Sequence, residues 1–378
     1  MSDEIYLDYN ATTPVLPEVV EAMLPYLRDH FGNPSSAHPR GRAAREAVEG
    51  ARVRVAGLLA CDPNEIVFTS GGTESNNLAI LGVAEARADR RHLVTSVFEH
   101  PAVVSPCARL EGRGWRVTRV DVDGEGRVRL ADVIGAIGPD TALVTVMHAN
   151  NETGVLQPVA TIARAARDAG AVVHTDAAQS VGKVPITVRE LGADLLSLAG
   201  HKIYAPKGVG ALYVRRGTAI QPVMLGAGHE GGLRPGTENV ASIVGLGVAC
   251  ELARLDLGVE AARVAALRER LWQRLSAEIP GLALNGHPTE RLPNTLSVRF
   301  PRVSGAALLA ASPEVSASTG SACHAGHEEA PSAIVAMGVA PQEALGTVRL
   351  TLGRGTTPEE IERAAAALVQ VWRTLATG

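Results

Sequence analysis

Aromatic residues are scarce in this chain of 378 residues, where Phe, Trp and Tyr together make up 3%. The core must therefore be built from Val, Leu, Ile and Ala, and the hydrophobic fraction of 46% is ample for that. Cysteine is also rare, and four cysteines in a chain this long exclude the disulfide framework of a small secreted domain. No C-x-x-C pair occurs, so the usual spacing of a zinc site is missing.

An excess of basic charge is missing as well, because 36 Lys and Arg oppose 40 Asp and Glu for a net charge of −4. This balance argues against a nucleic acid or a membrane surface as the main partner. The N-terminus lacks the basic start and apolar run of a signal peptide, and no apolar stretch approaches the length that spans a bilayer. We therefore expect a cytoplasmic protein.

Short apolar runs alternate with Ala-rich amphipathic stretches from about residue 17 to residue 245. Strands are expected at 66–69, 92–97, 117–122, 142–148, 171–175, 195–198 and 210–214, and helices at 78–86 and 159–169. This rhythm is typical of a mostly parallel sheet covered by helices on both faces.

The pattern changes after about residue 255. One face of a long helix is marked by Val264, Leu267, Leu271, Leu275 and Ile279, and a strand at 294–300 and a final helix near 361–375 follow. Because 378 residues exceed the size of a single core, we expect a second, smaller α+β domain here. Its boundary near 250–260 is left open, since a helix could bridge the two domains.

A glycine-rich turn joins the first of these strands to its helix in the segment 68–77, FTSGGTESNN. Gly72 would let the backbone approach a ligand closely, and a helix that begins near Thr73 would direct free N–H groups and its positive dipole end at a phosphate. Taken alone, an ordinary strand-to-helix turn is the favoured interpretation. Neither the dinucleotide fingerprint nor the P-loop pattern fits the segment.

Asp176 ends an apolar run, which places it at the carboxyl end of a buried strand. Ligands of open α/β sheets bind outside this edge, and a carboxylate there would hold a pyridine nitrogen protonated. A cap for the next helix is the other interpretation, and this segment alone favours neither.

Lys202 directly follows another apolar run and stands next to His201 among Gly and Pro residues. Confinement would lower the pKa of its amine and let it form a Schiff base with an aldehyde, although most lysines lie in surface loops. The order along the chain favours the Schiff base. A phosphate site, then Asp176, then Lys202 about one βα unit later would supply three complementary partners for one cofactor on one sheet edge.

Cys323 lies among small residues in the segment 316–323, SASTGSAC, and His324 and His327 follow it. An exposed thiol near imidazoles can act as a thiolate nucleophile. There are two alternatives: the cysteine is incidental, or it forms half of a zinc site with a histidine. Because no further cluster of Cys or His in the sequence would complete a zinc site, we expect no metal. The other cysteines have helical, apolar surroundings that are typical of core positions: Cys61, Cys107 and Cys250.

Together these four motifs, in this order, make the chain similar to the class V pyridoxal-phosphate-dependent aminotransferase family, and within it to the cysteine desulfurases. The resemblance covers nearly the whole chain and includes YLDYNATTP at 6–14, GNPSS at 32–36, EH at 99–100, NNETG at 150–154, RPGTEN at 234–239, RLPNT at 291–295 and LGRGTT at 352–357.

The resemblance implies the α/β fold of the aspartate aminotransferases, called fold type I, with a mixed, mostly parallel seven-stranded sheet. It divides the chain into an N-terminal arm at 1–15 that packs with the small domain, a large cofactor-binding domain at 16–255, and a small domain at 256–378 that carries Cys323.

The resemblance also implies a role for each site residue. Lys202 binds the aldehyde of pyridoxal phosphate, His100 stacks on the ring as an acid/base group, and Cys323 accepts sulfur. The remaining cofactor contacts are Gly72, Thr73 and His201 at the phosphate, Asp176 at the pyridine nitrogen, Gln179 at the ring hydroxyl, Asn151 at the ring, and Thr237 from the second subunit of a homodimer. Asn33 and Arg354 bind the substrate carboxylate, a task that suits a guanidinium.

The implied reaction converts L-cysteine to L-alanine. Sulfur passes to Cys323 as a persulfide and then to an acceptor protein, such as a scaffold for iron–sulfur cluster assembly or a thiolation enzyme. Selenocysteine lyase is the close alternative, because the Cys323-His324 pair, the spacing to Pro331 and the apolar Ala199 resemble that group. Desulfurases usually have Ser where Ala199 stands. Another class V aminotransferase or lyase does not explain the cysteine in this segment.

Overall fold

The computed structural model describes residues 4–320 and 329–377. Its main element is a seven-stranded sheet with the order β2-β8-β7-β6-β5-β3-β4. Neighbours from β4 to β7 are parallel, whereas β8 runs antiparallel to both β7 and β2. The predicted mixed, mostly parallel seven-stranded sheet is confirmed. In that order the strands are β2 (Ile66–Thr69), β8 (Gly210–Val214), β7 (Leu195–Ala199), β6 (Val172–Asp176), β5 (Thr141–Thr145), β3 (His92–Ser96) and β4 (Arg116–Val120).

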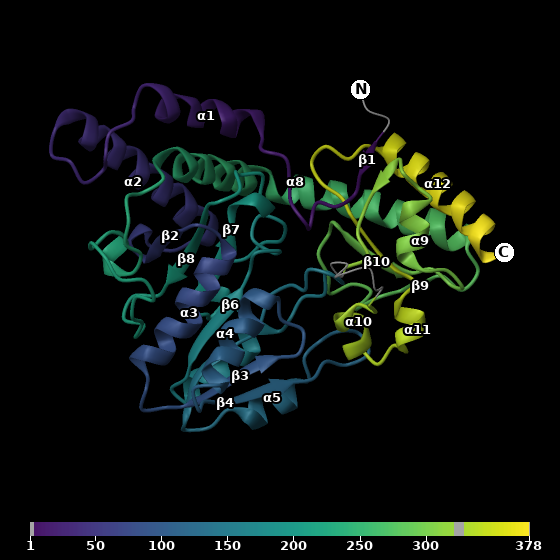
Figure 1. Ribbon diagram of the computed structural model, residues 1–378, viewed down its shortest axis with the longest axis horizontal. Helices are drawn as coiled ribbons and strands as arrows, with labels where there is room; N and C mark the ends of the chain where they lie inside the picture. The colour runs from purple at the N-terminus through teal and green to yellow at the C-terminus, as the bar shows by residue number, and fades with distance from the viewer. Residues whose placement is uncertain (1–3, 321–328, 378) are drawn as a thin grey trace.

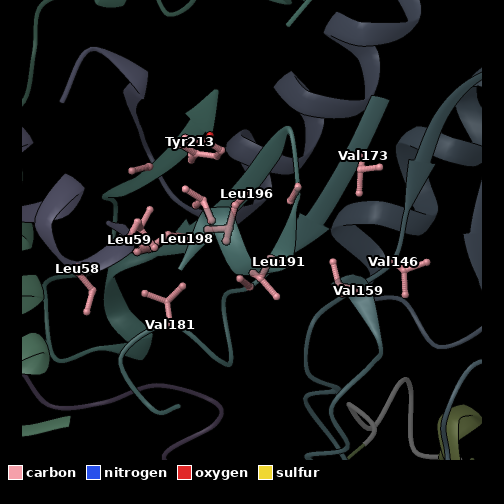
Figure 2. Packing of buried hydrophobic residues seen from close by; sticks show 14 of the residues in the cluster. Leu58, Leu59, Val146, Val159, Val173, Val181, Leu191, Leu196, Leu198 and Tyr213 are labelled. Carbon is pink, nitrogen blue, oxygen red and sulfur yellow. The ribbon is translucent and has the colours of Figure 1, made fainter. Parts of the chain in front are cut away.

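Helices cover both faces of this sheet. One face packs against α3 (Gly72–Ala86) and α4 (Pro101–Glu111). The other packs against α2 (Pro39–Leu59), α5 (Leu130–Ala136), α6 (Val159–Asp168), α7 (Val188–Leu191) and the first part of α8 (Val240–Glu278), while α1 (Pro17–Arg28) lies on α8. Successive side chains of a strand point to opposite faces, so in β7 Leu195 joins the first of these cores and Leu196 and Leu198 join the second. Figure 2 shows part of the second core, where Leu58 and Leu59 of α2 gather with Leu196 and Leu198.

The 39-residue helix α8 connects the two lobes of the molecule (Figure 1). Its first half contributes Leu246 and Cys250 to the core on the sheet, and its second half contributes Leu271 and Leu275 to a separate core. The predicted helical face therefore exists, but the helix ends at Glu278, and Ile279 is its extended C-cap. The helix crosses the region in which the sequence left a boundary open.

The second lobe contains a three-stranded antiparallel sheet in the order β12-β10-β9 and a two-stranded parallel pair, β1 with β11. Its strands are β1 (Ile5–Tyr6), β9 (Ala283–Leu284), β10 (Thr295–Arg299), β11 (Val315–Ser316) and β12 (Thr347–Thr351), and its helices are α9 (Gly305–Ala310), α10 (Ser332–Ala336), α11 (Pro341–Ala344) and α12 (Pro358–Ala376). Ile5 and Leu7 from the N-terminus pack in this lobe's core. Ile334 of α10 instead packs with the core on the large sheet. The domain bounds stay a prediction.

Three short 3-10 turns complete the described elements: η1 (Pro63–Glu65), η2 (Gly200–Lys202) and η3 (Glu230–Gly232). The strands expected at 92–97 and 142–148 end earlier than predicted, at Ser96 and Thr145, although the N–H groups of Val97, Val146 and His148 still bond carbonyls of neighbouring strands. Within the described ranges, no helix combines the length and the apolar composition that crossing a membrane requires.

A buried ion pair ties the segment that carries η3 to the large sheet. Arg52 donates to both carboxylate oxygens of Glu230 at 2.7 and 2.8 Å and to the Ile66 carbonyl at 2.7 Å. The same carboxylate accepts from the Phe68 N–H at 2.7 Å. The side chains of Arg52 and Glu230 are 10% and 2% exposed, so neither charge is well solvated.

We expect Arg52→Ala to lower the free energy of unfolding by about 3–5 kcal/mol, because it leaves the Glu230 carboxylate buried without its counter-ion. Arg54→Ala is the matched control: its ion pair with Glu251 is 42% and 41% exposed, so its loss should cost only about 0–1 kcal/mol. Urea unfolding of both variants measures the difference. Equal losses would show that the burial of the Arg52–Glu230 pair carries no extra cost.

Candidate active site

A cavity of about 400 Å³ lies at the carboxyl edge of the large sheet, where β6 ends and η2 follows β7. Eight residues that the sequence predicts to hold a cofactor line it: Gly72, Thr73, His100, Asn151, Asp176, Gln179, His201 and Lys202. They come from separate segments that the parallel strand order brings to one edge.

Lys202 stands in η2, directly after β7, and its amine is largely enclosed. Its Nζ donates hydrogen bonds to the carbonyls of Asn10 at 2.5 Å and Ala11 at 2.8 Å. Burial, helped by the nearby Arg349 guanidinium, lowers the pKa of this amine to about 8. A sizeable fraction of Lys202 is therefore neutral near physiological pH, which makes it a competent nucleophile toward an aldehyde.

Asp176 is the last residue of β6 and is 7% exposed. One carboxylate oxygen accepts from the Ala178 N–H at 2.9 Å, and the other accepts from the Asn76 side-chain amide at 2.7 Å. The helix cap that the sequence allowed is wrong, because turns follow Asp176 and the next helix, α7, begins at Val188 with Thr187 as its N-cap. The carboxylate instead stabilises the turn after the strand and borders the cavity, and its role at a ring nitrogen stays a prediction. Each oxygen keeps a lone pair, so the carboxylate can still accept a hydrogen bond from a protonated ring nitrogen.

The two histidines of the cavity are both held by their Nδ1 atoms. Nδ1 of His100, the N-cap of α4, accepts from the Ala102 N–H at 3.1 Å, and Nδ1 of His201 lies 3.2 Å from the Thr12 hydroxyl. Burial lowers the pKa of His100, and burial together with Lys202 lowers the pKa of His201 to about 4. Both rings are therefore neutral at physiological pH, and the Nε2 atom of each is left for a ligand.

The glycine-rich turn opens a second cavity of about 350 Å³, which shares Ala11, Gly72, Thr73 and His201 with the first. The N-cap of α3 is Gly71, so Thr73 is the second residue of the helix and lies near its N-cap, as predicted. The φ of Gly71, 147°, lies in a range that favours glycine. At Gly72 a side chain would be tight, because a Cβ there would lie 3.3 Å from the Cβ of Ala199. The N-terminus of α3 thus borders both cavities with two residues that lack side chains, and its free N–H groups and positive dipole end suit an anion.

Taken together, these groups fit pyridoxal phosphate. The amine of Lys202 matches the aldehyde, the carboxylate of Asp176 matches the ring nitrogen, and the N-terminus of α3 matches the phosphate. An unsatisfied polar atom supports the fit: among the described residues, none bonds the buried Oδ1 of Asn76, whose amide also borders the cavity.

Three predicted site residues that the structure describes do not line this cavity. Asn33 and Thr237 border a separate hollow of about 1060 Å³, and the Asn33 carboxamide accepts from the Ser35 N–H at 2.9 Å. Arg354 pairs with Asp256 at 2.9 Å and borders a small cavity of about 40 Å³ behind Lys202. Cys323 lies outside the described residues, so its position stays a prediction.

Several cavity residues escaped the sequence reasoning, notably Asn10, Asn76 and Arg349. For Asn76 a signal existed, because it follows Gly72 by four residues and must lie on the same face of α3. Arg349 carries no such signal: it is a single arginine in the strand β12, and only the fold brings it beside Asn151, whose carbonyl accepts from it at 3.0 Å.

Two of the remaining cysteines are core residues, as predicted, since Cys107 and Cys250 are fully buried. Cys61 is only half-buried, because it follows the C-cap of α2 rather than lying inside the helix. In residues 4–320 and 329–377 no group of three or more His, Cys, Asp or Glu side chains could hold a metal ion.

Comparisons with known proteins agree with the geometry. Residues 5–364 match the family described as "Aminotransferase class-V". A protein of Anaeromyxobacter dehalogenans (strain 2CP-C) named "Cysteine desulfurase IscS" is 50% identical over 96% of this chain and 91% of its own length. The solved structure of a "NIFS-LIKE PROTEIN" has a TM-score of 0.91 at 36% identity and covers 99% of this chain and 100% of its own. The structure titled "SspA in complex with cysteine" has a TM-score of 0.82 at 38% identity and covers 92% of this chain and 98% of its own.

Proposed function

The chain belongs to the class-V aminotransferase family, and from this premise we propose that it is a cysteine desulfurase that uses pyridoxal phosphate. The observation that carries the proposal is the cavity in which the Lys202 amine, the Asp176 carboxylate and the N-terminus of α3 meet. The similarity at 50% identity to a protein named cysteine desulfurase indicates which member of the family it is.

Pyridoxal phosphate, when bound, draws electrons away from the Cα of an amino acid, so that the Cα proton can leave and the Cβ–S bond can break. The chain supplies the groups around that chemistry. Asp176 would keep the ring nitrogen protonated, Gln179 would donate to the ring hydroxyl oxygen, and His100 would stack on the ring as an acid/base group. Thr73 and His201 hold the phosphate with the help of Gly72.

Lys202 has two tasks in this proposal. It would hold the cofactor through its aldehyde, and its neutral amine, when free, would take the Cα proton of the substrate and return a proton to it. A pKa near 8 suits this exchange, because an acid/base group works best when its pKa lies near the working pH.

Arg354 binds the substrate carboxylate in this proposal, together with Asn33. Its guanidinium bonds Asp256 and stacks over Tyr204 at 5.6 Å, on the far side of Lys202 from the main cavity. Because Asp256 is exposed, its pairing with Arg354 is weak and a buried substrate carboxylate can replace it.

Cys323 is the proposed sulfur acceptor. Its thiolate attacks the substrate sulfur, the Cβ–S bond breaks, and a persulfide on Cys323 and alanine result. Backbone hydrogen bonds between Ser318 and Arg349, at 2.7 and 3.4 Å, hold residue 318 beside the cavity. Five residues can span up to about 17 Å, so the length of chain between Ser318 and Cys323 permits the proposed contact with the substrate.

We also propose a cytoplasmic homodimer that passes sulfur to an acceptor protein. Thr237, assigned to the phosphate of the neighbouring subunit, borders a large hollow away from this chain's own site. In the same segment Leu225 is 88% exposed and Met224 is 47% exposed, an apolar surface that a second subunit would cover.

Mass spectrometry of Cys323 tests the proposed function. The purified protein, loaded with pyridoxal phosphate and given L-cysteine, should add one sulfur atom to Cys323 while alanine accumulates in solution. L-Selenocysteine is assayed in parallel. Alanine released without any sulfur on Cys323 would contradict the proposal, and much faster turnover of selenocysteine than of cysteine would indicate the lyase instead.

The pH dependence of cofactor capture follows from the lowered pKa of Lys202. Only the neutral amine attacks an aldehyde, so the capture rate of the cofactor-free protein should rise about tenfold per pH unit below pH 8 and level off above it. Stopped-flow absorbance from pH 6 to pH 10 measures this rate. A rate that keeps rising to pH 10 would show that Lys202 has an ordinary pKa.

A further inference from the structure

The chain contains only three lysines among its 36 basic residues, and the other 33 are arginines. All three lie between residues 183 and 207: Lys183, Lys202 and Lys207. Lys202 has a role in the proposed function, and Lys207 is exposed beside the glycine-rich turn. Lys183 contacts no proposed ligand, so the presence of lysine rather than arginine at this position needs another explanation.

The amine of Lys183 is enclosed and makes two hydrogen bonds. Its Nζ donates to the side-chain oxygen of Gln179 at 2.9 Å and to the side-chain oxygen of Asn10 at 3.1 Å. The side-chain nitrogen of Gln179 in turn donates to the Asn10 carbonyl at 3.0 Å. Gln179 is 6% exposed and lines the main cavity, whereas Lys183 stands behind it, on the border of the small cavity.

This contact fixes which end of the Gln179 amide faces Lys183. A lysine amine that donates to an amide must meet its oxygen, so the NH₂ end of Gln179 is turned away from Lys183. One of the two N–H groups bonds Asn10, and the other is left for the cavity. Without Lys183 only the bond to the Asn10 carbonyl would hold this orientation, so the amide would turn its oxygen toward the cavity more often, where it would repel an anionic ligand oxygen.

We propose that Lys183 is a positioning residue that holds the Gln179 amide with an N–H toward the ring hydroxyl of the cofactor. The inference rests on the proposed function, because it needs a cofactor whose ring carries an ionised hydroxyl.

Arginine is a poor substitute at this position for two reasons. Its guanidinium is larger, and it stays protonated, which would add a permanent charge near the cations of Lys202 and Arg349. Burial lowers the pKa of Lys183 well below its usual value, and both of those cations lower it further. Lysine can lose its proton there and still donate the two hydrogen bonds.

The test is the visible absorbance of the cofactor-loaded protein, titrated with pH in the absence of substrate. A donor to the ring oxygen stabilises its anionic form, so Gln179→Leu should raise the midpoint of this titration by about one pH unit. Lys183→Met, which is unbranched and only one atom shorter but lacks the donor, should raise it similarly. The other titratable groups that face the cavity are unchanged in these variants: His100, Asp176, His201, Lys202 and Arg349.

The double variant separates positioning from a general structural effect. If Lys183 acts through Gln179, Lys183→Met combined with Gln179→Leu shifts the midpoint no further than Gln179→Leu alone. Lys183→Arg keeps N–H donors and adds a permanent positive charge, so its midpoint should not rise above that of the wild type, provided that its thermal midpoint confirms folding.

Each result decides the inference. The inference is overturned if the two shifts add in the double variant, or if the midpoint of Lys183→Met does not move. If Lys183→Met does not fold, an upward shift of about one pH unit in Lys183→Arg would overturn it. A wild-type protein that binds no pyridoxal phosphate would instead contradict the proposed function, so the two failures are distinguishable.

Discussion

Lys202→Ala should lower desulfurase turnover by at least about 10³-fold, within the range of 10²–10⁴ that one positioned acid/base group contributes, and remove the visible absorbance of the lysine-bound cofactor. The structure gives two reasons. Lys202 is the amine whose lowered pKa suits it to attack an aldehyde, and it borders both the main cavity and the small cavity that contains Arg354. No other lysine lines the main cavity.

Lys202→Arg is the matched variant for this experiment. It keeps a positive charge and can still donate to the Asn10 and Ala11 carbonyls, so it preserves most of the local hydrogen bonding. A guanidinium cannot lose its proton at working pH, so the Arg variant should be as inactive as the Ala variant. Absorbance spectra and alanine release report the two losses separately. Normal turnover in either variant would overturn the assignment of Lys202.

Cys323→Ala should abolish the protein-bound persulfide and sulfur transfer to an acceptor, yet leave the cofactor absorbance unchanged. The described cysteines cannot take over this task, because burial raises the pKa of Cys61 and of Cys107 to about 12 and raises that of Cys250 as well. A thiol with such a pKa is almost never a thiolate at neutral pH, and only the thiolate is nucleophilic.

Cys61→Ala is the natural control, since Cys61 is the least buried of these three thiols. It should leave persulfide formation intact, as measured by mass spectrometry after reaction with L-cysteine. Unimpaired sulfur transfer by Cys323→Ala would show that the acceptor lies elsewhere. Loss of the absorbance in the same variant would show that residue 323 holds the cofactor rather than the sulfur.

Much of the site was predictable because its residues are placed by local patterns. Asp176 ends an apolar strand, Lys202 follows one, and the two glycines at 71–72 separate a strand from a helix. In a parallel sheet such positions meet at one edge whatever the details of packing. The same reasoning placed the seven strands, with errors of a few residues where the chain leaves the sheet.

The long helix α8 shows where local pattern stops being sufficient. The apolar residues of its first half pack into one core and those of its second half pack into another. The hydrophobic periodicity therefore indicated a helical face at residues 264–279 but did not show that the helix begins at Val240. Likewise α10 stands late in the chain yet packs on the core of the large sheet. Which core a segment joins depends on shape complementarity across the molecule and not on its own sequence.

The sequence by itself determined the sheet, its catalytic edge, the lysine and carboxylate on that edge, and the family resemblance. The reason is that hydrophobic period and chain order specify which residues end strands and where those ends meet. Only the tertiary structure decided the partners of those residues: Asn76 on Asp176, Lys183 on Gln179, and the carbonyls of Asn10 and Ala11 on Lys202. The contacts of Asp176 and Lys202 join residues 100 to 192 positions apart, so no local pattern encodes them. Lys183 and Gln179 are only four residues apart, but their bond depends on the burial of both groups and on Asn10, which the fold brings beside them.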